Sequence, residues 1–177
     1  MTLEISQRQL DRRRFIAGVG TAALVISGAA ILHPVEAWGL EVKNLRPETM
    51  LTLIKVSRDI YPHDRLADRY YAIAMKSWDE KSGSDPATRQ LIEQGIATLD
   101  ELAKSKYGVP YAEVGWESER VNLLRQLEDE AFFQKIRSDL IVSLYNQKEV
   151  WPLFGYEGES AAKGGYINRG FDDIAWL

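Results

Sequence analysis

The stretch from residue 11 to residue 37 constrains the rest of the chain most. It has a charged start with the paired arginines Arg12 and Arg13, and Phe15 follows them shortly after. A mildly apolar middle comes next, and the small residue Ala37 stands at the end. These are the three parts of an export signal, and the paired arginines are typical of the twin-arginine type. That machinery moves proteins that have already folded. We therefore predict a signal over 1–37, cleaved after Ala37, and a separate fold that forms before export.

An uncut membrane anchor is the alternative for the same stretch. The apolar run from Ile16 to Leu32 is shorter than the roughly 20 residues that a spanning helix needs. It is also diluted by Gly18, Gly20 and Gly28, so it would insert weakly into lipid. The sequence therefore favours a cleaved signal over an anchor.

The remaining 140 residues suit one domain with a modest core. Once the four basic and three acidic residues of the signal are removed, 18 basic and 23 acidic residues remain, a net charge of −5. A nucleic-acid surface needs a basic stripe, and binding to anionic lipid needs excess positive charge. The charge therefore argues against both kinds of partner.

The chain has no cysteine, and His63 is its only histidine after the signal. Disulfides, thiolate-held iron–sulfur clusters and covalently attached c-type haem are therefore excluded. One imidazole without a thiol cannot assemble a histidine-based zinc or haem site. We therefore expect no cofactor in this chain, and any redox cofactor would belong to a partner.

Apolar residues recur at helical spacing after the signal, and no stretch alternates as a strand does. Five helices are predicted: Pro47 to Tyr61, about Arg65 to Lys81, Pro86 to the residues before Gly108, one capped by Ser118, and Ala131 to Asn146. Asp129 either caps the fifth helix, or the last two segments form one bent helix. The fold class predicted for 38–146 is an all-α small helical bundle.

Two finer predictions concern single positions in these helices. Ile73 is expected on the apolar face of the second helix, together with Leu66, Tyr70, Ala74 and Trp78. Gly95 is expected to weaken the third helix by about 1 kcal/mol relative to alanine.

Residues 147–177 form an irregular C-terminal arm rich in glycine and aromatic residues. One interpretation is a tail folded back over its own bundle. The other is an arm that lies on a partner, because aromatic residues and arginine are enriched at interface centres. The candidate interface residues are Trp151, Pro152, Phe154, Tyr156, Tyr166, Arg169, Phe171 and Trp176.

Motifs for catalysis are missing from the sequence. The glycines of the tail fit neither a phosphate loop nor a dinucleotide fingerprint, and no nucleophile elbow occurs. His63 could act as a general base beside Asp64 or Asp59, which would make the chain a free-standing periplasmic enzyme. A lone histidine in a helix–helix turn is more often a packing residue, so no catalytic residue is assigned.

Three blocks of sequence resemble a known family. They are 47–64, with Ser57-Arg58-Asp59-Ile60-Tyr61-Pro62-His63-Asp64; 149–158, with Trp151-Pro152-Leu153-Phe154-Gly155-Tyr156; and 163–173, with Lys163-Gly164-Gly165-Tyr166-Ile167-Asn168-Arg169-Gly170-Phe171. Together with the twin-arginine start, they resemble the gluconate 2-dehydrogenase subunit 3 family. The resemblance extends over nearly the whole chain, and the two tail blocks are its most specific part.

The resemblance implies a non-catalytic small subunit in a periplasmic dehydrogenase complex for sugars, polyols or sugar acids. In that family a large subunit of the glucose–methanol–choline type carries FAD, and a multihaem cytochrome c often passes its electrons to the membrane. The small subunit carries the export signal for the pair and acts as a chaperone in maturation of the large subunit. The complex is associated with the cytoplasmic membrane.

Overall fold

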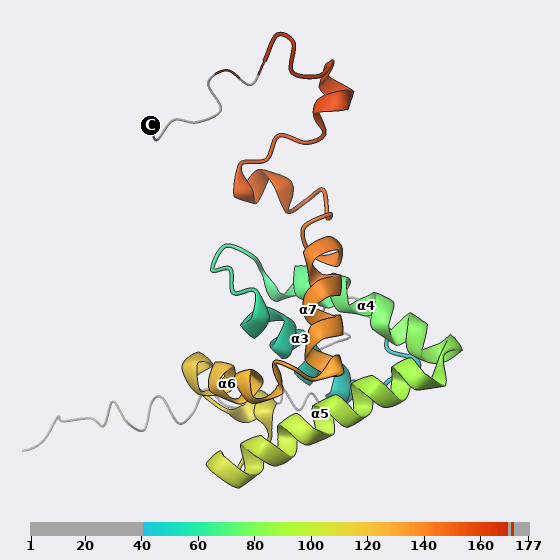
Figure 1. Cartoon of the computed structure of the whole chain (residues 1–177), viewed down its shortest axis with the longest axis vertical. Coiled ribbons are helices and arrows are strands. Elements are labelled where there is room, and N and C mark those ends of the chain that lie inside the picture. Colours follow the sequence, from blue (N-terminus) through green and yellow to red (C-terminus); the bar gives the residue numbers. More distant parts are fainter. Residues whose placement is uncertain (1–40, 170, 172–177) are drawn as a thin grey trace, which may run out of the picture. The chain divides into compact units, whose positions relative to one another are not determined.

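The chain is helical over most of the residues that the structure describes. This computed structural model describes residues 41–169 and 171. Within them lie no strand and five α-helices: α3 (Pro47–Ile60), α4 (Asp68–Ser84), α5 (Pro86–Tyr107), α6 (Glu117–Leu124) and α7 (Ala131–Ser143) (Figure 1). The all-α prediction is confirmed for this part of the chain. None of the described helices combines the length and apolar character needed to cross a membrane.

Two helices begin and end as their local sequence predicts. Pro47 is the first residue of α3, where its fixed φ fits and its missing N–H costs nothing. At the start of α5, the Asp85 carboxylate accepts a hydrogen bond of 3.0 Å from the backbone N–H of Ala87. Gly108 ends α5 with a φ of 77°, a left-handed conformation that glycine adopts without strain.

The predicted start of the second helix is wrong by three residues, since α4 begins at Asp68 and not at Arg65. Leu66 is instead buried in the preceding loop, with 1% of its surface exposed. Its N–H donates to the carbonyl of His63, and Arg58 donates to the Leu66 carbonyl at 2.9 Å. Contacts with α3 therefore override the helical propensity of this segment.

The capping predictions for the last two helices are also wrong. Helix α6 begins at Glu117, so Ser118 lies inside it and caps nothing. A short 3₁₀ turn, η2 (Arg125–Leu127), follows α6, and α7 starts separately at Ala131. Glu130 occupies the N-cap position of α7 without a side-chain hydrogen bond, so neither Asp129 capping nor one bent helix is observed.

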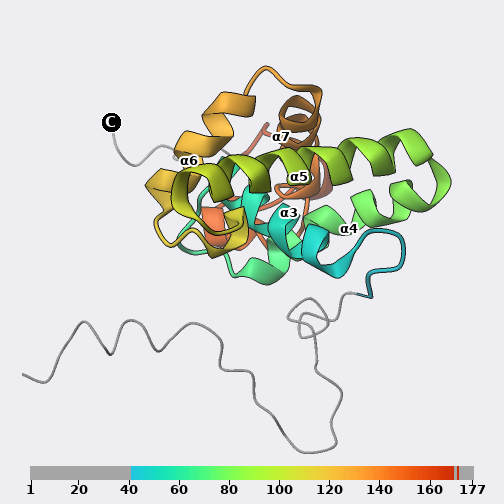
Figure 2. The same cartoon turned by 90° about the horizontal axis from the view of Figure 1, so that it is seen from below.

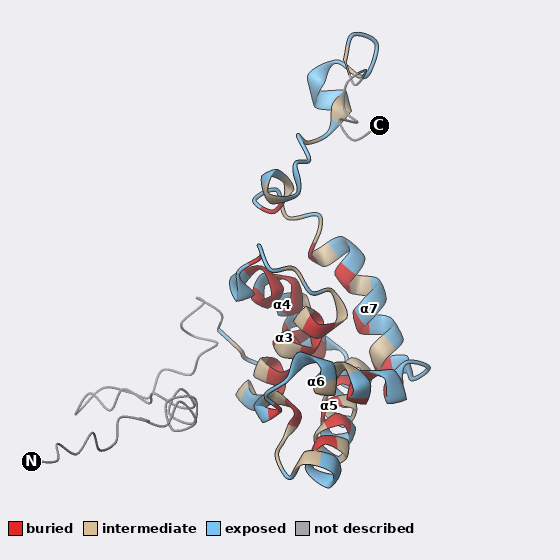
Figure 3. Cartoon of the chain, turned by 90° about the vertical axis from the view of Figure 1, so that its left-hand side faces the viewer, coloured by how far each residue is buried: buried red, intermediate tan, exposed pale blue. Residues whose placement is uncertain are grey.

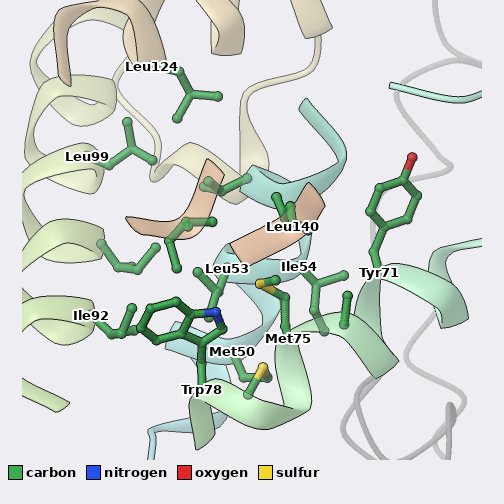
Figure 4. Packing of buried hydrophobic residues seen from close by; sticks show 14 of the residues in the cluster. Met50, Leu53, Ile54, Tyr71, Met75, Trp78, Ile92, Leu99, Leu124 and Leu140 are labelled. Carbon is green, nitrogen blue, oxygen red and sulfur yellow. The ribbon is translucent and has the colours of Figure 1, made fainter. Parts of the chain in front are cut away.

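One core joins the helices, with α3 at its centre. Helix α3 contacts α4, α5, α6 and α7. The longest described helix, α5, contacts α3, α4, α6 and α7 (Figure 2). The buried side chains interlock across these helices; they include Met50, Leu53, Ile54, Met75, Trp78, Ile92, Leu99 and Leu140 (Figure 4). Ile73 was predicted in this core but is 51% exposed, because Tyr71 and Met75 fill the buried face of α4.

Gly95 has a packing role that the propensity argument missed. A Cβ placed on Gly95 would overlap the ring of Phe132, which belongs to α7. Phe132 is itself buried, with 4% of its surface exposed. The missing side chain therefore lets the Phe132 ring lie directly against the backbone of α5, and this contact offsets the conformational cost of glycine in a helix.

We predict that Gly95→Ala destabilises the protein although alanine is the better helix former. Overpacking a full core costs about 1–3 kcal/mol, which exceeds the roughly 1 kcal/mol gained in helix propensity. Urea unfolding measures the change, with Ser105→Ala on the exposed face of α5 as control. A second Phe132→Ala change should make Gly95→Ala less costly than it is alone. An increase in stability for Gly95→Ala alone would contradict this packing.

The described chain starts at a segment clamped by a buried carboxylate. Asp79 of α4 is 4% exposed and accepts hydrogen bonds from the backbone N–H groups of Lys43, Asn44 and Leu45 at 2.8–3.0 Å. The Asn44 side chain donates in turn to the Asp79 carbonyl. The residues that directly precede α3 are therefore fixed to α4 by backbone contacts.

A buried ion pair connects α3 to α6. Arg120 forms a two-pronged contact with Asp59, with Nε to Oδ2 at 2.7 Å and Nη2 to Oδ1 at 2.8 Å. The Tyr111 hydroxyl donates to the same carboxylate at 2.7 Å, and burial together with Asp59 raises the pKa of Tyr111 above its usual range. The remaining Arg120 nitrogen donates to the carbonyls of Val114 and Gly115, so every charge in this group is paired.

The C-terminal arm starts on the bundle and then leaves it. Val150 is fully buried, and Leu153 packs against the core. Two short 3₁₀ turns follow, η3 (Trp151–Phe154) and η4 (Ser160–Lys163), and neither contains a buried residue. Most of the arm after residue 153 is exposed (Figure 3). The fold-back interpretation therefore describes residues 150–153 only.

Candidate functional site

His63 and Tyr145 form the joint between the α3–α4 loop and the end of α7. His63 Nε2 and the Tyr145 hydroxyl are 2.6 Å apart and share a hydrogen bond. The Phe154 ring stands edge-on to His63 with its centroid at 4.9 Å, and the Tyr61 ring stands edge-on to Tyr145 at 5.8 Å. The α3–α4 loop, the end of α7 and the start of the arm therefore meet in one aromatic cluster.

The local sequence after α7 fixes the start of the arm at this joint. The Trp151 indole N–H donates to the carbonyl of Tyr145 at 2.8 Å. Gly155 ends η3 at a φ of 74°, which reverses the chain so that the Tyr156 ring packs edge-on to Trp151 at 5.2 Å. Gly158 has a φ of 102° and passes close to the Trp151 ring. The block 149–158 therefore folds around Trp151.

Phe154 lines two separate hollows. The first, with a volume of about 600 Å³, we call the aromatic hollow; it is lined by Ile141, Val142, Tyr145, Asn146, Trp151, Phe154, Tyr156 and Glu159. The second, of about 670 Å³, is lined by residues 62–65 and 152–155 and contains His63. Four apolar side chains around the aromatic hollow are 44–63% exposed: Ile141, Val142, Phe154 and Tyr156.

The environment of His63 favours its neutral form. Burial lowers the pKa of His63, the positive charge of Arg58 lowers it further, and Asp64 opposes them weakly. A neutral ring nitrogen can accept a hydrogen bond from the Tyr145 hydroxyl. Burial also raises the pKa of Tyr145. Neither Asp64 nor Asp59 is hydrogen-bonded to His63 in the described residues, and Asp59 is instead paired with Arg120. The predicted acid–base pairing of His63 is therefore not observed.

The candidate interface residues take different positions along the arm. Trp151 is half-buried, whereas Pro152, Phe154 and Tyr156 are exposed at η3. Further along, Tyr166 and Phe171 are 59% and 79% exposed.

Arg169 pairs with Glu157 of the same arm, and Lys163 donates to the same carboxylate at 2.9 Å. These contacts lower the pKa of Glu157, chiefly through the hydrogen bond from Lys163. Trp176 and the signal residues Arg12, Arg13, Phe15 and Ala37 lie outside the described residues.

Sequence reasoning missed the contribution of α7 to this surface. Ile141 and Val142 lie in the predicted fifth helix, yet these apolar side chains are 54% and 63% exposed. The buried face of α7 and its C-cap consists of residues spaced four apart: Phe132, Ile136, Leu140 and the C-cap residue Leu144. Ile141 and Val142 do not belong to this spacing of four. Their position outside the buried spacing is the feature of the sequence that could have indicated their exposure.

Comparison with known proteins adds no assignment. No protein family model, no curated protein and no solved structure matches this chain. Within residues 41–169 and 171, no group of three or more histidine, aspartate and glutamate side chains is placed to hold a metal ion.

We predict that acidification weakens the joint at His63. In the unfolded chain a histidine binds a proton near pH 6.5, and the fold lowers this pKa. The contribution of neutral His63 to the free energy of unfolding is therefore complete above pH 6.5. It is lost as the pH falls from about 6.5 to the lower folded pKa. Wild type should lose more stability across this window than His63→Gln, which keeps a hydrogen-bonding group but does not titrate.

Two measurements check this prediction on the full chain. Urea unfolding at a series of pH values compares wild type with His63→Gln, and NMR titration of the His63 ring protons gives its folded pKa. A folded pKa at or above 6.5 would contradict a neutral His63 in this partly buried joint.

Proposed function

We propose that this chain is the non-catalytic small subunit of an exported FAD-dependent dehydrogenase for sugars, polyols or sugar acids. Its partner is a large subunit of the glucose–methanol–choline type, which holds FAD. A multihaem cytochrome c with its own haem accepts the electrons and links the complex to the cytoplasmic membrane. The small chain contributes the twin-arginine signal and assists maturation of the flavoprotein.

The observation that carries the proposal is the exposed aromatic surface around Phe154. Soluble monomers seldom leave several large apolar side chains exposed side by side, and such patches mark interaction sites. Phe154 and Tyr156 of the arm lie beside Ile141 and Val142 of α7 around one hollow. This combination of aromatic side chains and a concave, apolar centre is what protein interfaces use as anchoring points.

Two further features support a docking surface. The surface is held in place before any partner binds, because Val150 is buried and Trp151 is bonded to Tyr145. A preformed surface loses less conformational entropy on binding. In addition, three of the eight residues that line the hollow, Trp151, Phe154 and Tyr156, belong to the block 149–158, one of the blocks that resemble the dehydrogenase small subunits.

A free-standing enzyme built on His63 gains no comparable support. Such an enzyme needs His63 beside an acidic group within hydrogen-bonding reach. The hydrogen-bond partner of His63 in the described residues is the Tyr145 hydroxyl, which belongs to the packing joint.

We predict that Phe154→Ala and Phe171→Ala each weaken assembly with the flavoprotein. A central aromatic anchor contributes about 2 kcal/mol or more, which corresponds to an affinity about thirtyfold lower. Both side chains are exposed, so their removal should leave the bundle folded. Trp151 is a less suitable test, because its indole bond to Tyr145 also holds the arm. Affinity measurement against the purified large subunit checks the prediction.

Trp116→Ala is the matched control for these variants. Trp116 is 75% exposed at the N-cap of α6 and lines neither hollow. Its removal should leave the affinity unchanged. Unchanged affinity for both Phe154→Ala and Phe171→Ala, with normal thermal unfolding, would exclude this surface as the interface.

We further predict that the double variant Arg12→Lys, Arg13→Lys keeps both subunits in the cytoplasm. Arginine offers a planar fork of hydrogen-bond donors that lysine cannot copy, although the charge is preserved. The change lies in the signal and leaves the folded bundle unaltered. Cell fractionation with a dehydrogenase assay should find the activity in the cytoplasm, with FAD bound and the small subunit uncut. Periplasmic activity at the wild-type level would show that these arginines do not carry the complex.

A further inference from the structure

A third cavity contains an incompletely paired cation. It has a volume of about 480 Å³ and is lined by Leu51, Ile54, Lys55, Arg58, Asp68, Ala112 and Arg120. None of these residues lines either hollow beside Phe154. Helix α3 supplies four of the seven, and the 3₁₀ turn η1 (Tyr111–Glu113) supplies Ala112.

The three cations of this cavity differ in how many of their donors are engaged. Arg120 uses its nitrogens on Asp59 and on the carbonyls of Val114 and Gly115. Arg58 donates to the carbonyls of Leu66 and His63 and to the Asp68 carboxylate at 2.9 Å.

Lys55 makes a single hydrogen bond in the described part of the chain, from Nζ to the Ala112 carbonyl at 3.1 Å. An ammonium has three donors, so two remain for a ligand.

The three cations also differ in whether a carboxylate is paired with them. Asp59 is paired with Arg120, and Asp68 is paired with Arg58. Among the described residues no carboxylate forms an ion pair with Lys55, so one positive charge is left over in a partly buried site. Burial lowers the pKa of Lys55 and the neighbouring Arg120 lowers it further, and together they outweigh the opposing effect of Asp59 and Asp68. A bound anion would offset both effects, because an opposite charge stabilises the protonated amine.

We propose that this cavity binds a small aliphatic monocarboxylate. The carboxylate accepts hydrogen bonds from Lys55 Nζ, and the hydrocarbon part of the ligand lies against Leu51 and Ile54. A single negative charge matches the one uncompensated cation. A phosphate dianion fits less well, because Asp59 and Asp68 leave one uncompensated positive charge and Asp68 at the same cavity repels a second negative charge.

NMR chemical-shift titration of the full chain with hexanoate tests this proposal at pH 7. Acetate, phosphate and chloride at equal ionic strength serve as comparison ligands. We expect saturable shifts around Leu51, Lys55 and Ala112, with hexanoate binding more tightly than acetate because of its buried methylene groups. Lys55→Met, which keeps the length of the side chain but removes the charge, should weaken binding about tenfold or more. Lys104→Met, at an exposed position of α5, should bind as wild type does.

A second measurement needs no variant and therefore does not depend on whether Lys55→Met folds. The pKa of the Lys55 amine, followed by NMR in the wild-type chain, should rise when hexanoate saturates the cavity. The proposal would be overturned by the absence of saturable binding, by phosphate binding as tightly as hexanoate, by equal affinities of wild type and Lys55→Met, or by an unchanged Lys55 pKa.

Discussion

The buried pair of Asp59 and Arg120 connects the end of α3 to α6. Asp59 lies one residue before the end of α3, and its carboxylate takes both prongs of the Arg120 guanidinium and the Tyr111 hydroxyl. Removing one partner from such a buried pair costs about 3–5 kcal/mol, because the other charge stays buried without compensation. The pair therefore ties α3, η1 and α6 together at one point, and the segments that follow α3 are positioned from that point.

Both candidate binding regions depend on how the end of α3 is held in place. On one side of it, Tyr61 and His63 leave the end of α3 and meet Tyr145, which orients the start of the arm and the hollow beside Phe154. The hydroxyl of Tyr71 adds a hydrogen bond of 2.6 Å to the Tyr61 carbonyl. On the other side, Lys55 lies one helical turn before Asp59 and faces the cavity that Arg120 closes. The same constraint thus underlies both the proposed docking surface and the proposed anion site.

Features that depend on neighbouring residues in the sequence could be predicted, and features that depend on contacts between distant residues could not. Helices α3 and α5 were placed well because Pro47, Asp85, Pro86 and Gly108 act on adjacent residues. The role of Gly95, the start of α4 and the exposure of Ile73 were missed, because they depend on packing between helices. The two decisive side-chain pairs are remote in sequence: His63 and Tyr145 are 82 residues apart, and Asp59 and Arg120 are 61 apart. No local pattern indicates such pairs.

The central claim is that residues 141–156 form a surface that a partner covers. Hydrogen exchange followed by mass spectrometry tests it most directly, by comparing the chain alone with the chain in complexes isolated from the periplasm. The account predicts slower amide exchange over 141–156 in the complex, and unchanged exchange over 47–60, which is already buried at the centre of the bundle. Equal exchange over 141–156 in both samples would contradict the claim.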